Sequence, residues 1–313
     1  MKPVAHELPM PDMSRLMSIE KEVLAIYQDQ TSQLLPAVRE ELQDITRSVK
    51  KANQALRKDV TASLVTLNGD LEGLEQSATD DLDEQELLRS RGALQSDIQR
   101  LTQVIEAVQA DRLPDLAAPR AAAEADIAQS ATALHEVEQT IKSREASLAE
   151  IDSSLALLNA PSISRALRQM IPEDKDIDSI LPAIKGPAAS PELVKAAIAK
   201  LNQHLDLLEQ GREYASVLKA RNKMAQALDQ EKHNLAVMQE ASRNLDETVS
   251  QYRHADALLE LRQQWLTQAQ RFIEGWSVVD KGMMDAADSS ALLAALFTAR
   301  DYLLAIRRRI EAA

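Results

Sequence analysis

The chain has 313 residues, a formal net charge of −13 and an isoelectric point near 5.0, so a phosphate backbone would be repelled and nucleic acid is not the expected partner. It has no cysteine, which excludes disulfides, zinc–thiolate sites and thiol catalysis. Aromatic residues make up only 3% of the chain and charged residues 27%, a composition typical of long helices and coiled coils rather than of a thick globular core.

The hydrophobic spacing is helical almost throughout, and no alternating Val/Ile/Thr runs are joined by an Asn-Gly or Asp-Gly turn. We therefore predict an all-α fold, an elongated antiparallel bundle of long helices that forms a coiled-coil rod. The N-terminal sequence MKPVAHELPMPDMSR lacks the apolar core of a secretory signal, and no run of about 18 consecutive apolar residues occurs. We expect a protein that is soluble when it is made.

Four helices are predicted in the first half of the chain. The first begins after Pro11-Asp12 and ends or kinks at Pro36, and the second ends near Asn68-Gly69, a tight turn or a helix stop. A turn at Pro114 and Pro119 precedes an Ala-rich helix. The predicted ranges are 14–35, 37–68, a third helix through Ile98, Leu101 and Ile105, and 120–159.

The second half begins its regular structure at Ser190-Pro191-Glu192, where a hydroxyl cap, a proline and a carboxylate suit a helix start. Because the single Gly211 costs about 1 kcal/mol, this helix is compatible with continuing to Glu274. Residues 212–274 alone would span roughly 95 Å. A turn at Gly275–Gly282 then precedes a last helix at 288–311. The long helix carries a seam that predicts a partner helix: Leu228, Leu235, Met238, Leu245, Val249, Tyr252 and Leu259.

The two ends of the chain are predicted to share one bundle. Most aromatic residues lie near the C-terminus, and plain core packing with the N-terminal helices explains them. They are Trp265, Phe272, Trp276, Phe297 and Tyr302, and Tyr27 of the first predicted helix is expected to join them. If both termini lie in this bundle, the midpoint of the chain is a hairpin at the distal tip of the rod. We predict three regions: 1–150, helices of the rod and head bundle; 151–211, an amphipathic hairpin or foot; and 212–313, the long return helix and C-terminal head helices.

The midpoint has the composition of an amphipathic hairpin. Residues 159–191 contain five prolines and one glycine, and the charges of residues 161–191 cancel. One such hairpin could not cross a bilayer alone, because its polar side would face hydrocarbon, whereas a ring of hairpins could. The same pattern would also cover the end of a merely soluble rod. The candidate membrane-interacting side chains are Leu155, Leu158, Ile163, Leu167, Met170, Ile171, Ile177, Ile180, Leu181, Ile184, Leu193 and Ile198; the candidate pore-lining side chains on the polar face are Ser162, Arg165, Arg168 and Gln169.

Catalytic and metal-binding motifs are not found in the sequence. The acidic residues Asp80–Glu84 lack the glycine and glutamate spacing of an EF-hand, which favours a solvated turn, and the histidines include no HExxH. P-loop, GxGxxG and GxSxG motifs do not occur. Arg307–Arg309 could contact lipid headgroups, or could complement the dipole of the last helix. We predict no enzyme activity, no cofactor and no metal.

The layout of the whole chain resembles the B component of the xenorhabdolysin-type binary α-pore-forming toxins, relatives of cytolysin A. The similarity lies in the Pro11-Asp12 helix start, the all-helical rod with its midpoint hairpin, and the spacing of Trp265, Phe272 and Trp276. It implies a soluble protein that leaves its producer without a recognisable signal peptide. It also implies a partner A component of similar fold, assembly into a hetero-oligomeric ring on a target cell membrane, and insertion of a foot at about 151–211.

Two alternatives remain open from the sequence. A cytoplasmic coiled-coil scaffold or adaptor would use the rod to hold two partners apart. An enzyme would need an active site that the residues do not assemble.

Overall fold

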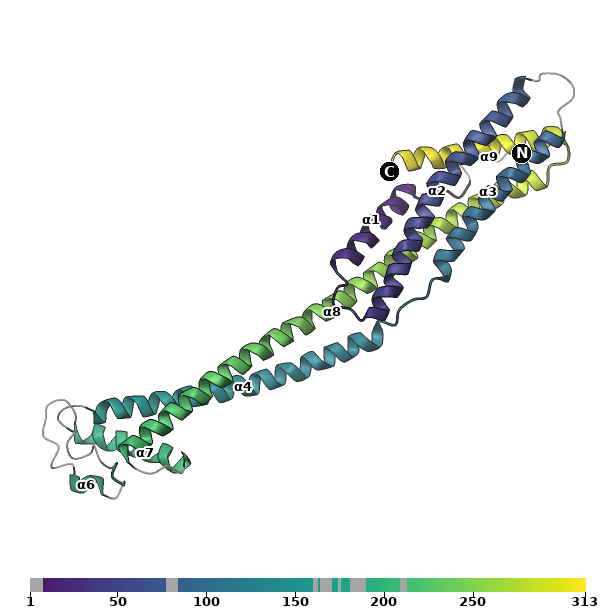
Figure 1. Cartoon of the computed structure of the whole chain (residues 1–313). Helices are drawn as coiled ribbons and strands as arrows, with labels where there is room; N and C mark the ends of the chain where they lie inside the picture. Colours follow the sequence, from purple (N-terminus) through teal and green to yellow (C-terminus); the bar gives the residue numbers. More distant parts are fainter. Residues whose placement is uncertain are drawn as a thin grey trace. The chain divides into compact units, whose positions relative to one another are not determined.

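A computed structural model describes residues 8–76, 84–159, 163, 171–173, 176–180, 190–208 and 213–313, with the side chains of 73–76, 180 and 205–208 excepted. Within these residues the chain is helical and contains no β-strand, which confirms the all-α class (Figure 1). The described helices are α1 (Met13–Asp29), α2 (Pro36–Gln76), α3 (Glu84–Ala110), α4 (Ala117–Leu158), α6 (Ile177–Ile180), α7 (Pro191–Leu208), α8 (Tyr214–Met284) and α9 (Ser289–Glu311).

The chain divides into two compact units. Unit 1 consists of residues 1–123 and 247–313, and unit 2 consists of residues 124–246. The described N-terminal segment and the C-terminal helix therefore lie in the same unit, as the distribution of aromatic residues predicts. The midpoint of the chain belongs to the other unit.

Helix starts follow the capping residues of the sequence. The side chain of Asp12 accepts a hydrogen bond from the backbone N–H of Arg15 at 2.9 Å, so α1 begins at Met13 as predicted. Asp288 does the same for α9, where its carboxylate accepts from Ala291 N–H at 2.7 Å. Ser190 Oγ accepts from Leu193 N–H at 3.3 Å at the start of α7.

Several predicted helix boundaries are wrong. Helix α1 ends at Asp29, before the predicted end at residue 35. Helix α2 continues past Asn68-Gly69 to Gln76, and α8 continues through Gly275 and Gly282 to Met284. The cost of a glycine inside a helix is only about 1 kcal/mol, which packing of the rest of the helix offsets. The helix that begins at Pro191 does not run on to Glu274, because α7 ends at Leu208 and α8 begins at Tyr214.

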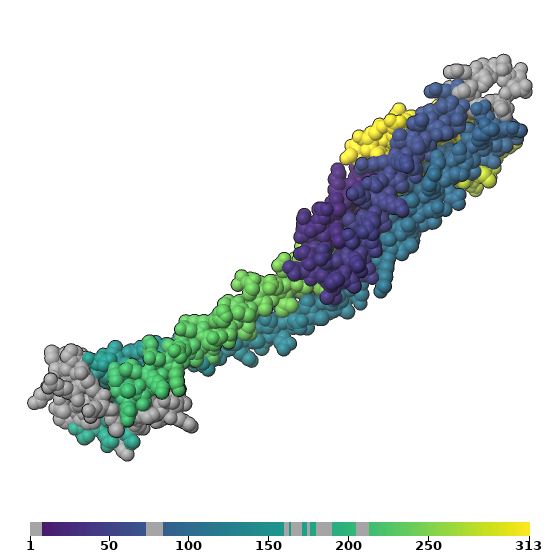
Figure 2. Space-filling model, viewed as in Figure 1, coloured from purple at the N-terminus to yellow at the C-terminus, as the bar shows by residue number. Residues whose placement is uncertain are grey.

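Unit 1 is a helical bundle in which α2 packs against α1, α3 and α9 (Figure 1). In the space-filling view, α1, α2 and α3 form the face of this unit turned to the viewer, and α9 shows along its edge (Figure 2). The core is built at helical spacing from every one of these helices and from α8. Its largest fully buried side chains are Trp265, Tyr302, Phe272, Met13, Leu16, Met17, Ile19, Leu42, Ile45, Leu56, Leu64 and Leu71.

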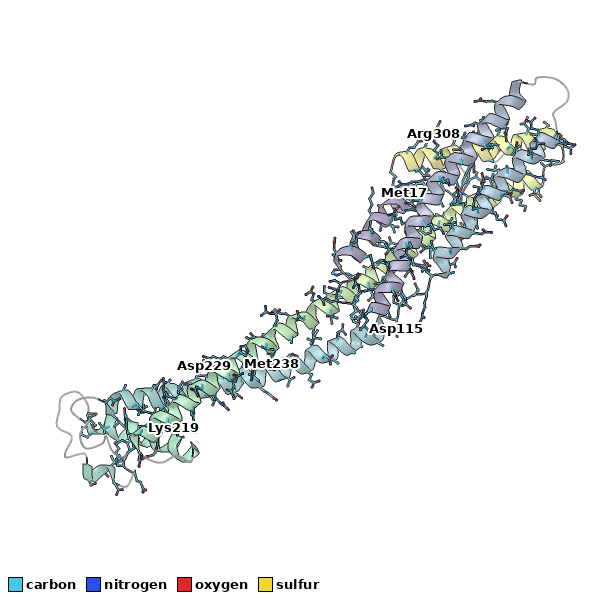
Figure 3. The ribbon with its side chains drawn as sticks, viewed as in Figure 1. Met17, Asp115, Lys219, Asp229, Met238 and Arg308 are labelled. Atoms are coloured by element: carbon cyan, nitrogen blue, oxygen red, sulfur yellow. The ribbon has the colours of Figure 1, made fainter. Side chains whose placement is uncertain are left out.

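Helix α9 is the one described helix that is long and apolar enough to cross a membrane by length and composition. Its side chains at 292, 296, 299, 303 and 306 are buried in the core of unit 1, and it carries Arg300 and Asp301 near its middle. We therefore interpret α9 as a core helix of the bundle. Its last turn holds Arg308, which is labelled in Figure 3, and Arg309. The two positive charges complement the negative end of the helix dipole.

Candidate membrane-interacting site

The apolar side chains near the midpoint of the chain form the core of unit 2. On α4, Ile151, Leu155 and Leu158 recur at steps of four and three, so they share one face of the helix. Helix α7 presents a matching face at the same spacing. The buried cluster comprises Ile151, Leu155, Leu158, Ile163, Ile171, Ile177, Val194, Ile198, Leu201 and Val217. The apolar side chains in this cluster are therefore buried against one another and shielded from solvent.

Six of the twelve predicted membrane-interacting side chains belong to this cluster. Leu155, Leu158, Ile163, Ile171, Ile177 and Ile198 are each no more than 5% exposed. Leu193 differs from them, because it lies on the outer face of α7 with 55% of its surface exposed. Ile180 lies in α6, and its side chain is outside the described residues. The other predictions also lie outside them: Leu167, Met170, Leu181, Ile184, Ser162, Arg165, Arg168 and Gln169.

Ion pairs join α4 to α8 within unit 2. Arg221 donates two hydrogen bonds of 2.8 Å to the carboxylate of Asp152, and this pairing lowers the pKa of Asp152. Further along the same helices, Arg144 pairs with Glu231 and Lys232 with Glu145, each at 2.7 Å. Lys219 and Asp229, labelled in Figure 3, bracket the stretch of α8 that carries Arg221. These ion pairs fix the register of α4 against α8.

A second set of polar contacts holds α7. Glu150 on α4 accepts hydrogen bonds from His204 Nε2 at 3.1 Å and Lys200 Nζ at 3.2 Å, and these bonds, that from His204 first, lower the pKa of Glu150. Asn202 Nδ2 donates to the carbonyl of Pro172 at 3.0 Å, and Lys195 Nζ pairs with Asp178 of α6 at 2.8 Å. Helix α7 thus has polar partners in three other segments of unit 2.

Sequence reasoning missed these polar contacts and the contribution of Val217. The His204–Glu150 partners are 54 residues apart, and one sequence carries no signal that pairs them. Val217 had a weak signal, since Tyr214, Val217 and Met224 follow helical spacing and all pack on the cluster.

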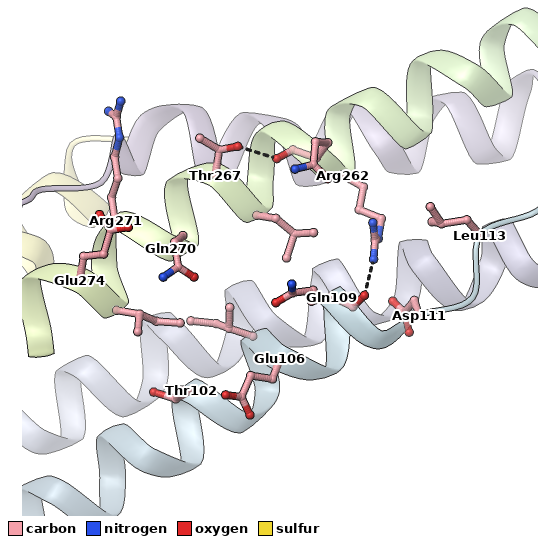
Figure 4. Close-up of a pocket in the computed structure, with 14 residues that line it drawn as sticks. Thr102, Glu106, Gln109, Asp111, Leu113, Arg262, Thr267, Gln270, Arg271 and Glu274 are labelled. Atoms are coloured by element: carbon pink, nitrogen blue, oxygen red, sulfur yellow. Dashed lines mark hydrogen bonds between the residues drawn. The ribbon is translucent and has the colours of Figure 1, made fainter.

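Unit 1 contains a groove of about 780 Å³ between α3 and α8, drawn in Figure 4. Its most buried charged residue, Arg262, donates hydrogen bonds to the carbonyls of Val108 (2.6 Å) and Gln109 (2.9 Å) at the end of α3. Burial lowers the pKa of Arg262. The guanidinium therefore caps orphan carbonyls of a helix terminus. Across the described parts of the chain, no group of three His, Asp or Glu side chains is placed to hold a metal ion.

No protein-family model and no curated protein matches the chain. Solved structures do match it. XaxB from Xenorhabdus nematophila aligns with a TM-score of 0.82 and 14% identity, covering 97% of this chain and 99% of XaxB. PaxB from Photorhabdus luminescens aligns with a TM-score of 0.76 and 15% identity over 97% and 98% of the two chains.

A chain of the XaxAB pore complex from Xenorhabdus nematophila also aligns, with a TM-score of 0.70 and 14% identity over 97% and 99% of the two chains. The similarity is thus higher to XaxB in its crystal structure than to the matching chain of the pore complex. With 14–15% of residues identical, these alignments show a shared fold and nothing beyond it. The chain has the fold of XaxB and PaxB along almost its whole length.

Proposed function

We propose that this chain is the B-type subunit of a two-component α-helical pore-forming cytolysin. The observation that carries the proposal is the structural match to XaxB and to a chain of the XaxAB pore complex over 97% of the residues. The partner is a subunit of similar helical fold, and the two form a hetero-oligomeric ring on a target membrane.

The present conformation corresponds to the subunit before assembly. The buried cluster of unit 2 supports this, because its apolar side chains are covered by protein. Full burial of each such side chain is worth about 1.5–3 kcal/mol, so exposing the ten to water is strongly unfavourable. Lipid offers these side chains an equally apolar environment. Their transfer from protein to lipid therefore becomes favourable where a membrane and a partner are both present. The candidate foot, residues 151–211, carries the membrane contact.

The remaining features of the proposal follow from the same mechanism. The protein acts through shape and association and has no catalytic step. It is soluble in its producer, is released to the outside and ends on the membrane of a target cell. The polar face of the foot, with Ser162, Arg165, Arg168 and Gln169, lines water in the assembled ring.

Dye release from liposomes tests the proposal. Phosphatidylcholine–cholesterol vesicles loaded with calcein, and red blood cells in parallel, are treated with this chain, with a helical partner encoded beside it, and with both. We expect release with the pair, and little with either protein alone. Absence of release from vesicles and cells in every mixture would reject a pore-forming role. Stable binding of the pair in solution without release would instead support the scaffold alternative.

A further inference from the structure

The apolar seam between α4 and α7 ends at a cluster of polar side chains. Lys200 and His204 lie one turn apart on α7, and both donate to the carboxylate of Glu150 on α4, at 3.2 and 3.1 Å. Their sequence neighbours Leu201 and Ile151 belong to the buried core of unit 2. We define Glu150, Lys200 and His204 as the α7 clamp.

The residues of the clamp differ in their exposure to solvent. His204 is 9% exposed, whereas half of the Lys200 side chain remains accessible. The carboxylate of Glu150 only accepts, so Nε2 of His204 carries the hydrogen that it shares. The two hydrogen bonds lower the pKa of Glu150, so its carboxylate stays charged to a lower pH than that of an unpaired glutamate. An opened clamp therefore leaves a charged acceptor and a largely buried donor to be satisfied elsewhere.

The other polar ties of α7 differ in what they hold. Lys195–Asp178 joins α7 to the short helix α6, and Asn202 binds the backbone at Pro172. The clamp joins α7 to the long helix α4, beside the residues that make up most of the apolar seam. Releasing α7 from α4 requires opening the clamp, whereas the contacts with Asp178 and Pro172 join α7 to segments other than α4.

We propose that the α7 clamp holds the foot in its soluble conformation and sets the rate at which the apolar cluster of unit 2 is released to a membrane. Apolar contacts are non-directional and are exchanged for lipid with little net change. Hydrogen-bonded polar groups find no partner in hydrocarbon, so the clamp has to open towards water, to which 51% of the Lys200 side chain and 46% of the Glu150 side chain are exposed. The barrier to release therefore includes the opening of the clamp, in addition to the exposure of the apolar cluster. The role of the clamp in release rests on the proposed function, whereas its existence rests on the geometry of the soluble protein.

Hydrogen–deuterium exchange on the soluble protein tests the existence of the clamp without any membrane. Glu150→Ala removes the shared acceptor, and we expect exchange of the α7 amides to become about 3- to 10-fold faster. Glu145→Ala is the matched control, since it removes an ion pair between α4 and Lys232 of α8 that does not involve α7. Exchange in unit 1 reports whether each variant is folded. Unchanged α7 exchange in a folded Glu150→Ala variant overturns the inference.

A reversible cross-link tests the role of the clamp in release. The chain has no cysteine of its own, so Glu150→Cys with His204→Cys can be joined by a short bis-maleimide that contains a reducible disulfide. With its partner and calcein-loaded vesicles, we expect the linked protein to release dye at least about 10-fold more slowly than the unmodified chain. After reduction α7 is no longer held to α4 by the link or by the clamp, so we expect release faster than that of the unmodified chain. Equal release by the linked and reduced proteins overturns the inference. If the unmodified chain releases no dye at all, the proposed function fails, and the exchange experiment alone decides whether the clamp exists.

Discussion

Trp265 Nε1 of α8 donates a 2.8 Å hydrogen bond to Asn53 Oδ1 of α2 in the core of unit 1, where both side chains are fully buried. The amide of Asn53 also donates to the carbonyl of Leu16 at 3.1 Å and to Glu20 at 3.0 Å, both on α1. One side chain therefore joins three helices. A buried polar group whose bonds are all made specifies one arrangement of its neighbours.

Replacing Asn53 by alanine should lower the free energy of unfolding of unit 1 by about 2–4 kcal/mol. The change leaves the indole N–H of Trp265 buried without a partner and opens a small cavity. Urea unfolding followed by tryptophan fluorescence measures the loss. Gln54→Ala, at the exposed neighbouring position on α2, is the control and should change stability by no more than about 0.5 kcal/mol. Similar values for the two variants would contradict this role.

Gly275 and Gly282 should respond in opposite directions to alanine. A methyl group on Gly275 would overlap the carbonyl of Pro9 and the ring of Tyr302, whereas nothing lies within 4 Å of the same group on Gly282. We expect Gly275→Ala to destabilise by about 1–3 kcal/mol, and Gly282→Ala to stabilise by up to about 1 kcal/mol. Thermal unfolding of the two variants measures the contrast. A neutral Gly275→Ala would mean that the N-terminal segment does not lie where we place it.

The two glycines also explain why sequence reasoning placed a turn between them. Glycine is a correct signal of a helix end when the backbone needs a left-handed residue, but here Gly275 provides close approach between α8, Pro9 and the phenol of Tyr302. The two contacts that require glycine come from Tyr302, which is 27 residues further along the chain, and from Pro9 near the other end of the chain. Neither contact can be read from the sequence around Gly275. Helix type and the capped starts of α1 and α9 were predictable because their signals are local.

In the candidate foot, too, some features could be predicted from the sequence and others could not. The apolar faces of α4 and α7 follow from spacing alone, so Leu155, Leu158 and Ile198 could be identified before the structure. Their polar neighbours could not, because His204 and Glu150 gain meaning only from a contact between separate helices. The placement of the two units as one rod, and the three predicted region boundaries, remain predictions.

Leu193→Asp should reduce dye release with the partner by about 10-fold or more, and leave folding intact. The side chain is 55% exposed, so a charge there meets water in the soluble protein but opposes burial in lipid. Val237→Asp is the matched control, on α8 in the same unit and 57% exposed. Calcein release and thermal unfolding are measured for both. Equal release by the two variants would remove Leu193 from the membrane-contacting surface.

The ion pair between Asp152 and Arg221 predicts a loss of stability in acid. The pKa of Asp152 is lower in the folded protein than its ordinary value of 3.8, because Arg221 binds the carboxylate. A group of this kind stabilises the fold above the unfolded pKa, and the contribution disappears as pH falls through the folded pKa.

Melting temperatures of the protein and of Asp152→Asn, measured from pH 7 to pH 2, check the sign. We expect the native protein to be the more stable at neutral pH and the difference to close below about pH 4. Asp246→Asn, at an exposed position on α8, is the control for the loss of one carboxylate from the same unit. A gap that widens towards low pH would contradict the assignment.

The environment of position 193 during pore formation tests the central claim most directly. Because the chain contains no cysteine, Leu193→Cys and the control Val237→Cys can each be labelled singly with the fluorophore NBD. With partner and vesicles, we predict that NBD at 193 brightens, shifts to the blue and is quenched by nitroxide lipids as dye release proceeds, while NBD at 237 is not quenched. If dye is released while the probe at 193 stays in water, the foot of this chain does not enter the membrane.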